Sequence, residues 1–132
     1  MSDTGCDVCL YGADDIDNDF YSDSVLTARK PHVCCECERE ISRGIRYQRA
    51  VGKSDGQMWT YKTCLLCVEV RRVFYCGGGY FFGMLWDDMQ EQAFPQLTTA
   101  SACFRELSPE AKAVVLDRWM RWKGLAPREV TA

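Results

Sequence analysis

The stretch RKPHVCCECERE, residues 29–40, contains the only histidine of the chain and three of its nine cysteines. Within it, Cys34 and Cys37 are separated by two residues, and Cys64 and Cys67 repeat this spacing further along the chain. Two such pairs from separate segments supply the four thiolates of a tetrahedral zinc site with little strain. We therefore predict that Cys34, Cys37, Cys64 and Cys67 bind a structural Zn²⁺ ion. Buried structural thiols or a redox dithiol are the alternatives, although no βαβ pattern supports a thioredoxin-like redox site.

The residues between and after these pairs predict a β-hairpin followed by a helix. Side chains alternate at strand spacing over residues 45–51, GKSDG at 52–56 is a turn signal, and Trp59 with Tyr61 belongs to a returning strand. After Cys64, the apolar residues Leu66, Val70 and Val73 recur at helical spacing. We expect an α+β domain in which residues 29–76 form a treble-clef-like zinc-binding core, made of a knuckle, a β-hairpin and a helix.

Residues 77–132 predict a helical extension of the same compact unit. One short helix is expected over residues 81–92 and ends at Pro95, and residues 96–104 are expected to form a loop. A second helix is expected to start with Ser108 as its N-cap and to stop at Gly124.

Residues 1–28 are expected to form an acidic arm or loop. Residues 1–23 contain seven aspartates and neither Lys nor Arg, so their formal charge is −7, whereas the 16 basic and 12 acidic residues that follow give +4. The arm also contains the pair Cys6 and Cys9, so a metal could pin it to the rest of the chain.

The remaining cysteines suggest a second metal site. If Cys34 and Cys37 face one zinc ion, the adjacent Cys35 must point elsewhere. We predict that a second site consists of Cys6, Cys9, Cys35 and Cys76, which leaves Cys103 as a core thiol. The alternative is a single zinc ion with a mobile N-terminus. His32 is expected to lie at the surface or next to the ligands, with ligation as the alternative.

Enzymatic activity is not expected, and no catalytic residue is assigned. A zinc site with four thiolates is closed, whereas zinc catalysis requires an open coordination position. Zinc deaminases carry His-x-Glu before Pro-Cys-x-x-Cys, but Val33 and Cys34 follow His32 here. One histidine also cannot supply the metal centre of an HNH-type nuclease.

The chain is expected to be a soluble cytoplasmic protein. The N-terminus has no basic segment followed by an apolar one, so a secretory signal is not indicated. No apolar run approaches the roughly 20 residues that cross a bilayer. In the reducing cytosol, metal ligation is a better use of nine cysteines than disulfides.

Two kinds of partner are consistent with the surface residues. The aromatic side chains exceed what a small zinc domain needs and predict a protein-binding patch, to which the acidic arm could add. The alternative is nucleic acid, although the sequence pI near 5.2 argues against non-specific binding. Its contacts would come from a basic face made of Arg46, Arg49, Lys53, Lys62, Arg71 and Arg72.

Three segments resemble a group of small cysteine-rich proteins of bacteriophages and prophages. They are ARKPHVCCECERE (28–40), the pattern Ile41, Gly44, Tyr47 and Arg49, and GKSDGQMWTYKTCLLC (52–67). The likeness covers roughly residues 28–90, including CGGG and LWDDM. One departure is Glu38, because a glycine commonly follows the second knuckle cysteine.

The resemblance implies a zinc-binding treble clef and an accessory protein that acts inside an infected bacterium. Small phage proteins of this kind often bind and inhibit host machinery, including CRISPR effectors and restriction systems. The first hypothesis is therefore a non-enzymatic, anti-CRISPR-like protein that binds a host protein or defence complex. A nucleic-acid-binding zinc-finger regulator is the alternative.

Overall fold

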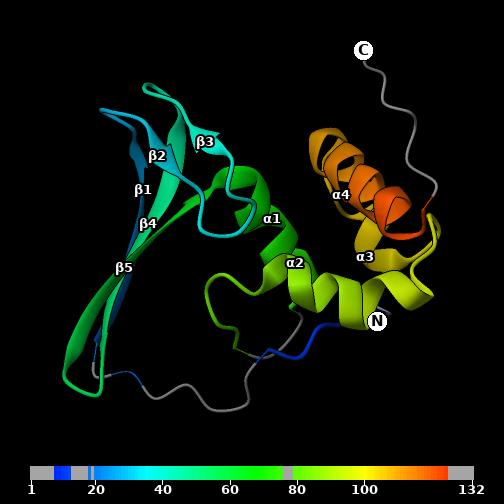
Figure 1. Cartoon of the computed structure of the whole chain (residues 1–132), viewed down its shortest axis with the longest axis horizontal. Helices are drawn as coiled ribbons and strands as arrows, with labels where there is room; N and C mark the ends of the chain where they lie inside the picture. Colours follow the sequence, from blue (N-terminus) through cyan, green and yellow to red (C-terminus); the bar gives the residue numbers. More distant parts are fainter. Residues whose placement is uncertain (1–7, 13–17, 19, 76–78, 125–132) are drawn as a thin grey trace.

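The computed structural model describes residues 8–12, 18, 20–75 and 79–124. It shows a long three-stranded antiparallel sheet on one side and a group of helices on the other, with helix α1 between them (Figure 1). The expected α+β class is therefore confirmed. The end of the sheet at the β4–β5 turn extends beyond the helices.

The sheet is built around the predicted hairpin. Strand β4 (Arg46–Ser54) pairs with β5 (Gln57–Cys64), from Tyr47 opposite Cys64 to Ser54 opposite Gln57. The strands are joined by Asp55 and Gly56, which both have positive φ, 53° and 79°. Such a two-residue turn matches the twist of the flanking strands, which explains why both strands extend into the region expected to be a turn.

Residues 20–27 are not part of a loop, so that part of the predicted arm is wrong. They form strand β1 (Phe20–Thr27), which pairs antiparallel with β4 from Phe20 opposite Lys53 to Thr27 opposite Arg46. All eight of its side chains are exposed. Backbone hydrogen bonds to β4 therefore hold this strand, and no apolar alternation marks it in the sequence.

The first cysteine pair lies in a tight turn between two very short strands. Strand β2 (His32–Val33) pairs with β3 (Glu40–Ile41), so the intervening CCEC segment forms a small loop beside the sheet. The backbone closes this loop, because Cys34 N–H donates to Arg39 O (3.0 Å) and Glu38 N–H donates to Cys34 O (2.9 Å).

The predicted helix after Cys64 is confirmed as α1 (Leu65–Phe74). The next helical stretch begins with α2 (Leu85–Asp88) and continues through the π-helix η1 (Met89–Ala93) into the 3₁₀ turn η2 (Phe94–Gln96).

Two helices close the described chain. The expected loop at 96–104 is wrong at its end, where α3 (Ala102–Arg105) forms a single helical turn. The last helix, α4 (Pro109–Trp122), is confirmed with its predicted cap, because Ser108 Oγ accepts a hydrogen bond from Ala111 N–H. Ser108 also donates from its N–H and its hydroxyl to the carboxylate of Glu69, at 2.6 and 2.8 Å, which joins the start of α4 to α1.

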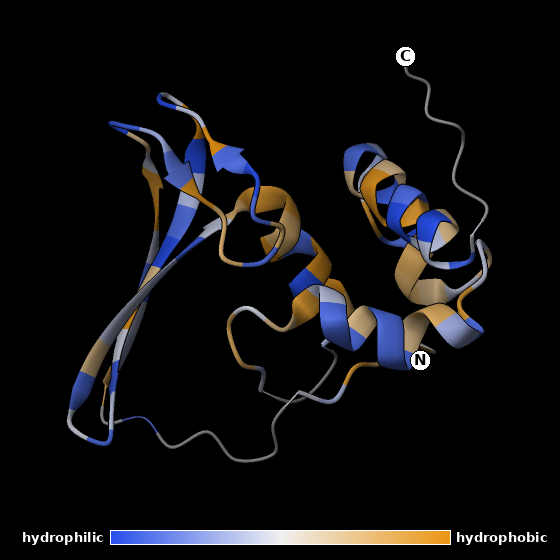
Figure 2. Cartoon of the chain, in the orientation of Figure 1, coloured by the Kyte–Doolittle hydropathy of each residue, from blue (hydrophilic) through white to orange (hydrophobic). Residues whose placement is uncertain are grey.

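One apolar core connects α1 with the later helices (Figure 2). It includes Val8 and Leu10, and Leu10 N–H donates to Phe74 O at the end of α1 (2.9 Å). Tyr11 exchanges two hydrogen bonds with the Gln92 side chain. Core packing and hydrogen bonds therefore anchor residues 8–12 to the helices.

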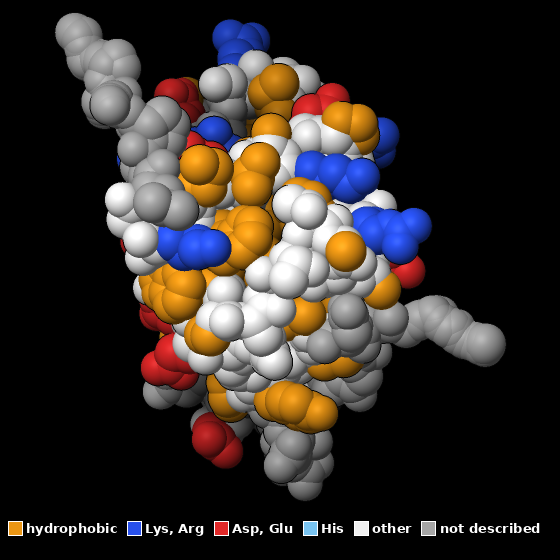
Figure 3. Space-filling view, turned by 90° about the vertical axis from the view of Figure 1, so that its right-hand side faces the viewer, with side chains coloured by type: hydrophobic (Ala, Val, Ile, Leu, Met, Phe, Trp, Pro, Cys, Tyr) orange, Lys and Arg blue, Asp and Glu red, His pale blue; other side chains and the backbone are white. Residues whose placement is uncertain are grey.

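On the helical side of the molecule, hydrophobic side chains are interspersed with polar ones (Figure 3). None of the helices in the described ranges is both long and apolar enough to cross a membrane.

Candidate metal centre and neighbouring surfaces

The four cysteines predicted to bind zinc lie together. One ligand atom from each of Cys34, Cys37, Cys64 and Cys67 lies within 4.8 Å of the others. The knuckle between β2 and β3 supplies one pair, and the junction of β5 with α1 supplies the other, since Cys64 ends the strand and Cys67 lies in the first turn of the helix. This first-turn position favours thiolates, because the positive end of the helix dipole lies there.

The spacing of the sulfur atoms fits a tetrahedral metal site. Zinc–sulfur bonds of about 2.3 Å place the ligand sulfurs of a tetrahedron about 3.8 Å apart. The Sγ atoms of Cys37 and Cys64 are 3.8 Å apart. Cys34 and Cys67 are fully buried, so solvent reaches neither sulfur. The cluster is thus suited to a metal such as zinc.

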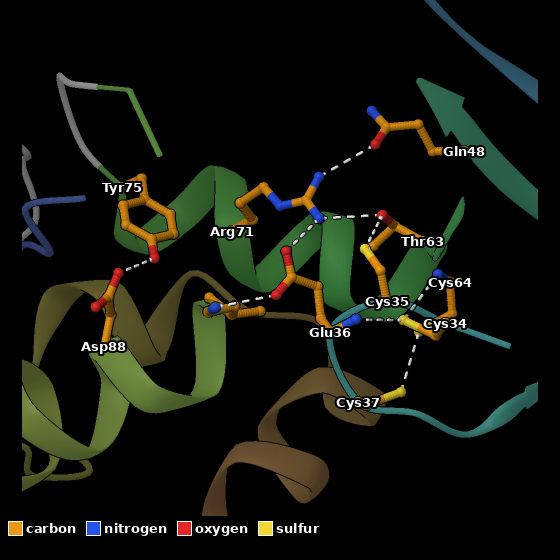
Figure 4. A network of polar contacts seen from close by, with 11 residues as sticks. Cys34, Cys35, Glu36, Cys37, Gln48, Thr63, Cys64, Arg71, Tyr75 and Asp88 are labelled. Carbon is orange, nitrogen blue, oxygen red and sulfur yellow. Dashed lines mark hydrogen bonds and ion pairs between the residues drawn. The ribbon is translucent and has the colours of Figure 1, made fainter. Parts of the chain in front are cut away.

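Backbone N–H groups point at one of these sulfurs (Figure 4). Cys34 Sγ accepts from Glu36 N–H at 3.4 Å and from Cys64 N–H at 3.3 Å. Hydrogen bonds of this kind stabilise a negatively charged sulfur. The two N–H groups therefore favour the thiolate form of Cys34, which is the form that binds a metal.

The four thiols also compete for protons. Hydrogen bonds with Cys34, Cys64 and Cys67 lower the pKa of the Cys37 thiol, whereas hydrogen bonds with Cys34, Cys37 and Cys64 raise the pKa of the Cys67 thiol. Contact with Cys37 in turn raises the pKa of Arg39, whose positive charge offsets part of the charge of the cluster. A metal ion that binds here must displace the shared protons, so its affinity falls as the pH is lowered.

Glu38 takes the backbone conformation of the glycine that it replaces in the knuckle pattern. Its φ is +64°, in the left-handed region that costs an ordinary residue about 1–2 kcal/mol. We expect Glu38→Gly to be at least as stable as the natural chain, and Glu38→Val to be less stable by about 1–2 kcal/mol, because β-branched residues avoid this region.

Urea unfolding at a fixed zinc concentration measures both changes. Glu40, an exposed residue of strand β3, provides the matched control, because there valine should be tolerated better than glycine. If the glycine variant were more stable than the valine variant at both positions, or less stable at both, the positive φ of residue 38 would not explain the difference.

Part of the predicted second site lies outside the described residues, namely Cys6 and Cys76. Cys35 points away from the four-sulfur cluster, and its Sγ lies 3.3 Å from Thr63 Oγ1. Cys9 is disulfide-bonded, and so is Cys103, which is buried in the core but is not the free thiol that was expected. A disulfide-bonded Cys9 has no thiolate to offer a metal, so the predicted second site of Cys6, Cys9, Cys35 and Cys76 lacks one of its four ligands in this structure. The expectation that the cysteines avoid disulfides is likewise wrong for Cys9 and Cys103.

His32 is not part of the sulfur cluster. Its ring lies 5.2 Å from the ring of Tyr47, between centroids, and it is half-buried at the start of the knuckle. In this position it is a packing residue beside the candidate ligands.

A buried ion pair lies next to the cluster, and the sequence did not indicate it. Arg71 Nη2 lies 2.6 Å from Glu36 Oε2, and the two side chains are only 3% and 1% exposed. Arg71 was expected to belong to the basic face that would contact nucleic acid, and its burial shows that this was wrong for Arg71. The available signal was its position four residues after Cys67, which puts both side chains on the same buried face of α1.

Further hydrogen bonds make this pair a junction between elements (Figure 4). Arg71 also donates to Thr63 Oγ1 (3.0 Å) in β5 and to Gln48 Oε1 (3.1 Å) in β4. Glu36 Oε1 accepts from Leu85 N–H (3.0 Å) at the start of α2. The knuckle, the sheet and two helices thus meet at these two charges.

Two cavities of contrasting chemistry flank the sheet. The first, of about 720 Å³, lies between the sheet and residues 80–82 and is lined by Tyr21, Trp59, Tyr61, Tyr80, Phe81 and Phe82. The second, of about 790 Å³, has a basic lining that includes Arg29, Lys30 and Arg49. Side chains alternate between the two faces of the sheet along β4, so Arg49 and Gly52 belong to opposite faces. Trp59 of the first cavity lies on Gly52, and Arg49 lines the second cavity, so the two cavities lie on opposite faces of the sheet.

No family model matches this chain, and neither a curated protein nor a solved structure matches it. Its function is therefore inferred from its own residues and their geometry.

Proposed function

We propose that the chain is a non-enzymatic, zinc-stabilised protein that acts by binding another protein. The metal is zinc because four cysteine sulfurs at tetrahedral spacing are the donor set that structural zinc sites use. The knuckle, the β4–β5 hairpin and α1 then correspond to a treble-clef-like domain. In this domain the metal supplies stability, and the surface supplies recognition.

The chemistry of the cluster supports a structural role. Four thiolates occupy every position of a tetrahedral zinc ion and leave none for water or substrate. The sequence contains one histidine, and its ring packs on the ring of Tyr47, outside the sulfur cluster.

The observation that carries the proposal is the aromatic cavity. Phe81 and Tyr21, which line it, are 57% and 41% exposed. Aromatic residues supply much of the binding energy in protein interfaces, and soluble proteins seldom gather so many on an exposed surface without a partner. The target we propose is a bacterial host protein or defence complex in the cytoplasm, as the resemblance to phage proteins suggests.

Nucleic acid is the second candidate, and the basic cavity is the observation that favours it. Arg49, Lys53 and Arg46 are exposed on strand β4, and the first of these lines that cavity together with Arg29 and Lys30. The face is smaller than expected, because Arg71 is buried in its ion pair with Glu36.

Affinity capture from bacterial lysate tests both candidates. We expect the natural chain to retain a specific protein at physiological salt, and a Tyr21→Ser/Phe81→Ser variant to retain at least about tenfold less of it, since the loss of a single aromatic anchor worth about 1.4 kcal/mol already weakens binding tenfold. Met58→Ser is the matched control, because Met58 is an exposed apolar residue on the opposite face of β5 from Trp59.

The alternative predicts a different result of the same experiment. The bound material would be sensitive to nuclease and to salt, and it would be lost from an Arg49→Glu/Lys53→Glu variant instead. Failure to retain any specific protein would contradict the first proposal.

A further inference from the structure

The walls of the aromatic cavity combine ring faces with negative charge. Besides its six aromatic residues, the lining contains the carboxylates of Asp23 and Asp55 and the polar side chains of Asn18 and Ser54. Among the residues that the structure describes, neither a Lys nor an Arg lines it. Both aspartates are exposed. An anionic ligand is therefore disfavoured here, and a cation is favoured by both components of the wall.

The aromatic rings are held in a fixed arrangement. Tyr61 and Phe82 stack with centroids 4.7 Å apart and planes at 11°, and Trp59 lies 5.6 and 5.7 Å from them. Trp59 Nε1–H donates to Ser54 Oγ (3.1 Å), and the Ser54 hydroxyl donates to Asn18 Oδ1 (2.7 Å).

Gly52 of strand β4 makes room for the indole. A Cβ atom at this position would lie 2.1 Å from Trp59 Cζ2, so the ring lies flat against the glycine backbone. The cavity wall is therefore preorganised and requires little ordering when a ligand binds.

The protein already uses this ring cluster to hold a guanidinium group. Arg71 Cζ lies 4.7 Å from the centroid of the Tyr80 ring and 4.9 Å from that of Phe82. Arg71 is buried and paired with Glu36, so it cannot fill the open cavity. Tyr21, Trp59, Tyr61 and Phe81 provide further ring surface in the lining, next to the two aspartates.

We infer that this cavity receives an arginine side chain of the partner protein. This inference rests on the proposed function and names the chemistry of its partner. A guanidinium group is planar, stacks on aromatic faces and forms paired hydrogen bonds with a carboxylate, so it uses both components of the wall at once. The cavity volume of about 720 Å³ accommodates the side chain together with the neighbouring peptide backbone.

The test is an NMR titration of the ¹⁵N-labelled, zinc-loaded full chain with the peptide acetyl-Gly-Arg-Gly-Arg-Gly-amide. We expect the Trp59 indole resonance, assigned with a Trp59→Phe variant, to shift and saturate. The same peptide with citrulline in place of arginine should bind at least about tenfold more weakly, because citrulline keeps the shape and loses the charge.

Matched variants locate the contact. Asp23→Asn/Asp55→Asn should weaken the arginine peptide at least about tenfold, whereas Glu91→Gln removes an exposed charge that is not part of the lining and should leave it unchanged. Equal binding of the citrulline peptide, or undiminished binding to the aspartate variant, would overturn the inference. Tetramethylammonium chloride binding as tightly as the peptide would also overturn it, since the cavity would then be a site for small cations.

Failure here is distinguishable from failure of the proposed function. If the arginine peptide does not bind but Tyr21→Ser/Phe81→Ser still abolishes capture of a lysate protein, arginine is the wrong occupant and the protein-binding function stands. If the peptide binds and no protein is captured, the cavity chemistry stands without the proposed function.

Discussion

A Cys67→Ser variant is expected not to bind the zinc ion that we propose for the four-cysteine site and, as a result, to lose the fold of the knuckle, the hairpin and α1. Binding of zinc by four thiolates contributes about 10–16 kcal/mol in structural sites, which is as large as the whole free energy of unfolding of a typical domain, about 5–15 kcal/mol. Serine fits the space but does not ionise at neutral pH. Zinc per chain by elemental analysis and circular dichroism of the purified variant measure the two losses.

Cys35→Ser is the matched control for this prediction. Cys35 is next to Cys34 in the sequence, yet its Sγ contacts Thr63 Oγ1 instead of the sulfur cluster. The variant should retain the zinc of the four-cysteine site and the circular dichroism spectrum of the natural chain. Equal loss of zinc in both variants would contradict the assignment of the ligands, and a natural chain that keeps its fold after exhaustive chelation would contradict the role of zinc itself.

The cysteine cluster was predictable from the sequence because the signals that define it lie within short segments of the chain. Two residues between cysteines set the geometry of each pair, and the turn and helix signals around Cys64 bring the second pair to the first. Strand β1 carried no such signal. Its side chains are all exposed, and its partner β4 is separated from it by the whole knuckle, so only the free edge of the hairpin determines where it pairs.

The burial of Arg71 could not be read from periodicity for a related reason. Arg71 and Arg72 are adjacent basic residues at the end of a short helix, where cations are common because they complement the helix dipole. What buries one and not the other is Glu36, which lies far away in the sequence and reaches α1 only after the knuckle has formed. A charge at a core position becomes recognisable only when its partner is known.

Arg71→Met is expected to destabilise the chain by about 3–5 kcal/mol, the largest effect we predict for a residue outside the cysteine cluster. Methionine keeps much of the apolar volume, but the carboxylate of Glu36 is left buried without its cation. The hydrogen bonds to Thr63 and Gln48 are lost as well. Arg72→Met is the matched control, since Arg72 is exposed on the same helix, and it should change the free energy of unfolding by less than about 0.5 kcal/mol. Urea unfolding of the zinc-loaded proteins measures both.

A second substitution separates the charge from the packing. Glutamine at position 36 carries no charge but can still accept the hydrogen bond from Leu85 N–H, which Glu36 Oε1 accepts in the natural chain. Adding Glu36→Gln to Arg71→Met should therefore recover about 1–3 kcal/mol, the penalty of an unpaired buried charge, even though Glu36→Gln alone destabilises the natural chain. If the two substitutions instead add their losses, lost packing alone explains the effect of Arg71→Met, and the two charges do not act as a pair. Recovery would establish that Glu36 and Arg71 act as a pair, and that the stability of the knuckle depends on this buried cation.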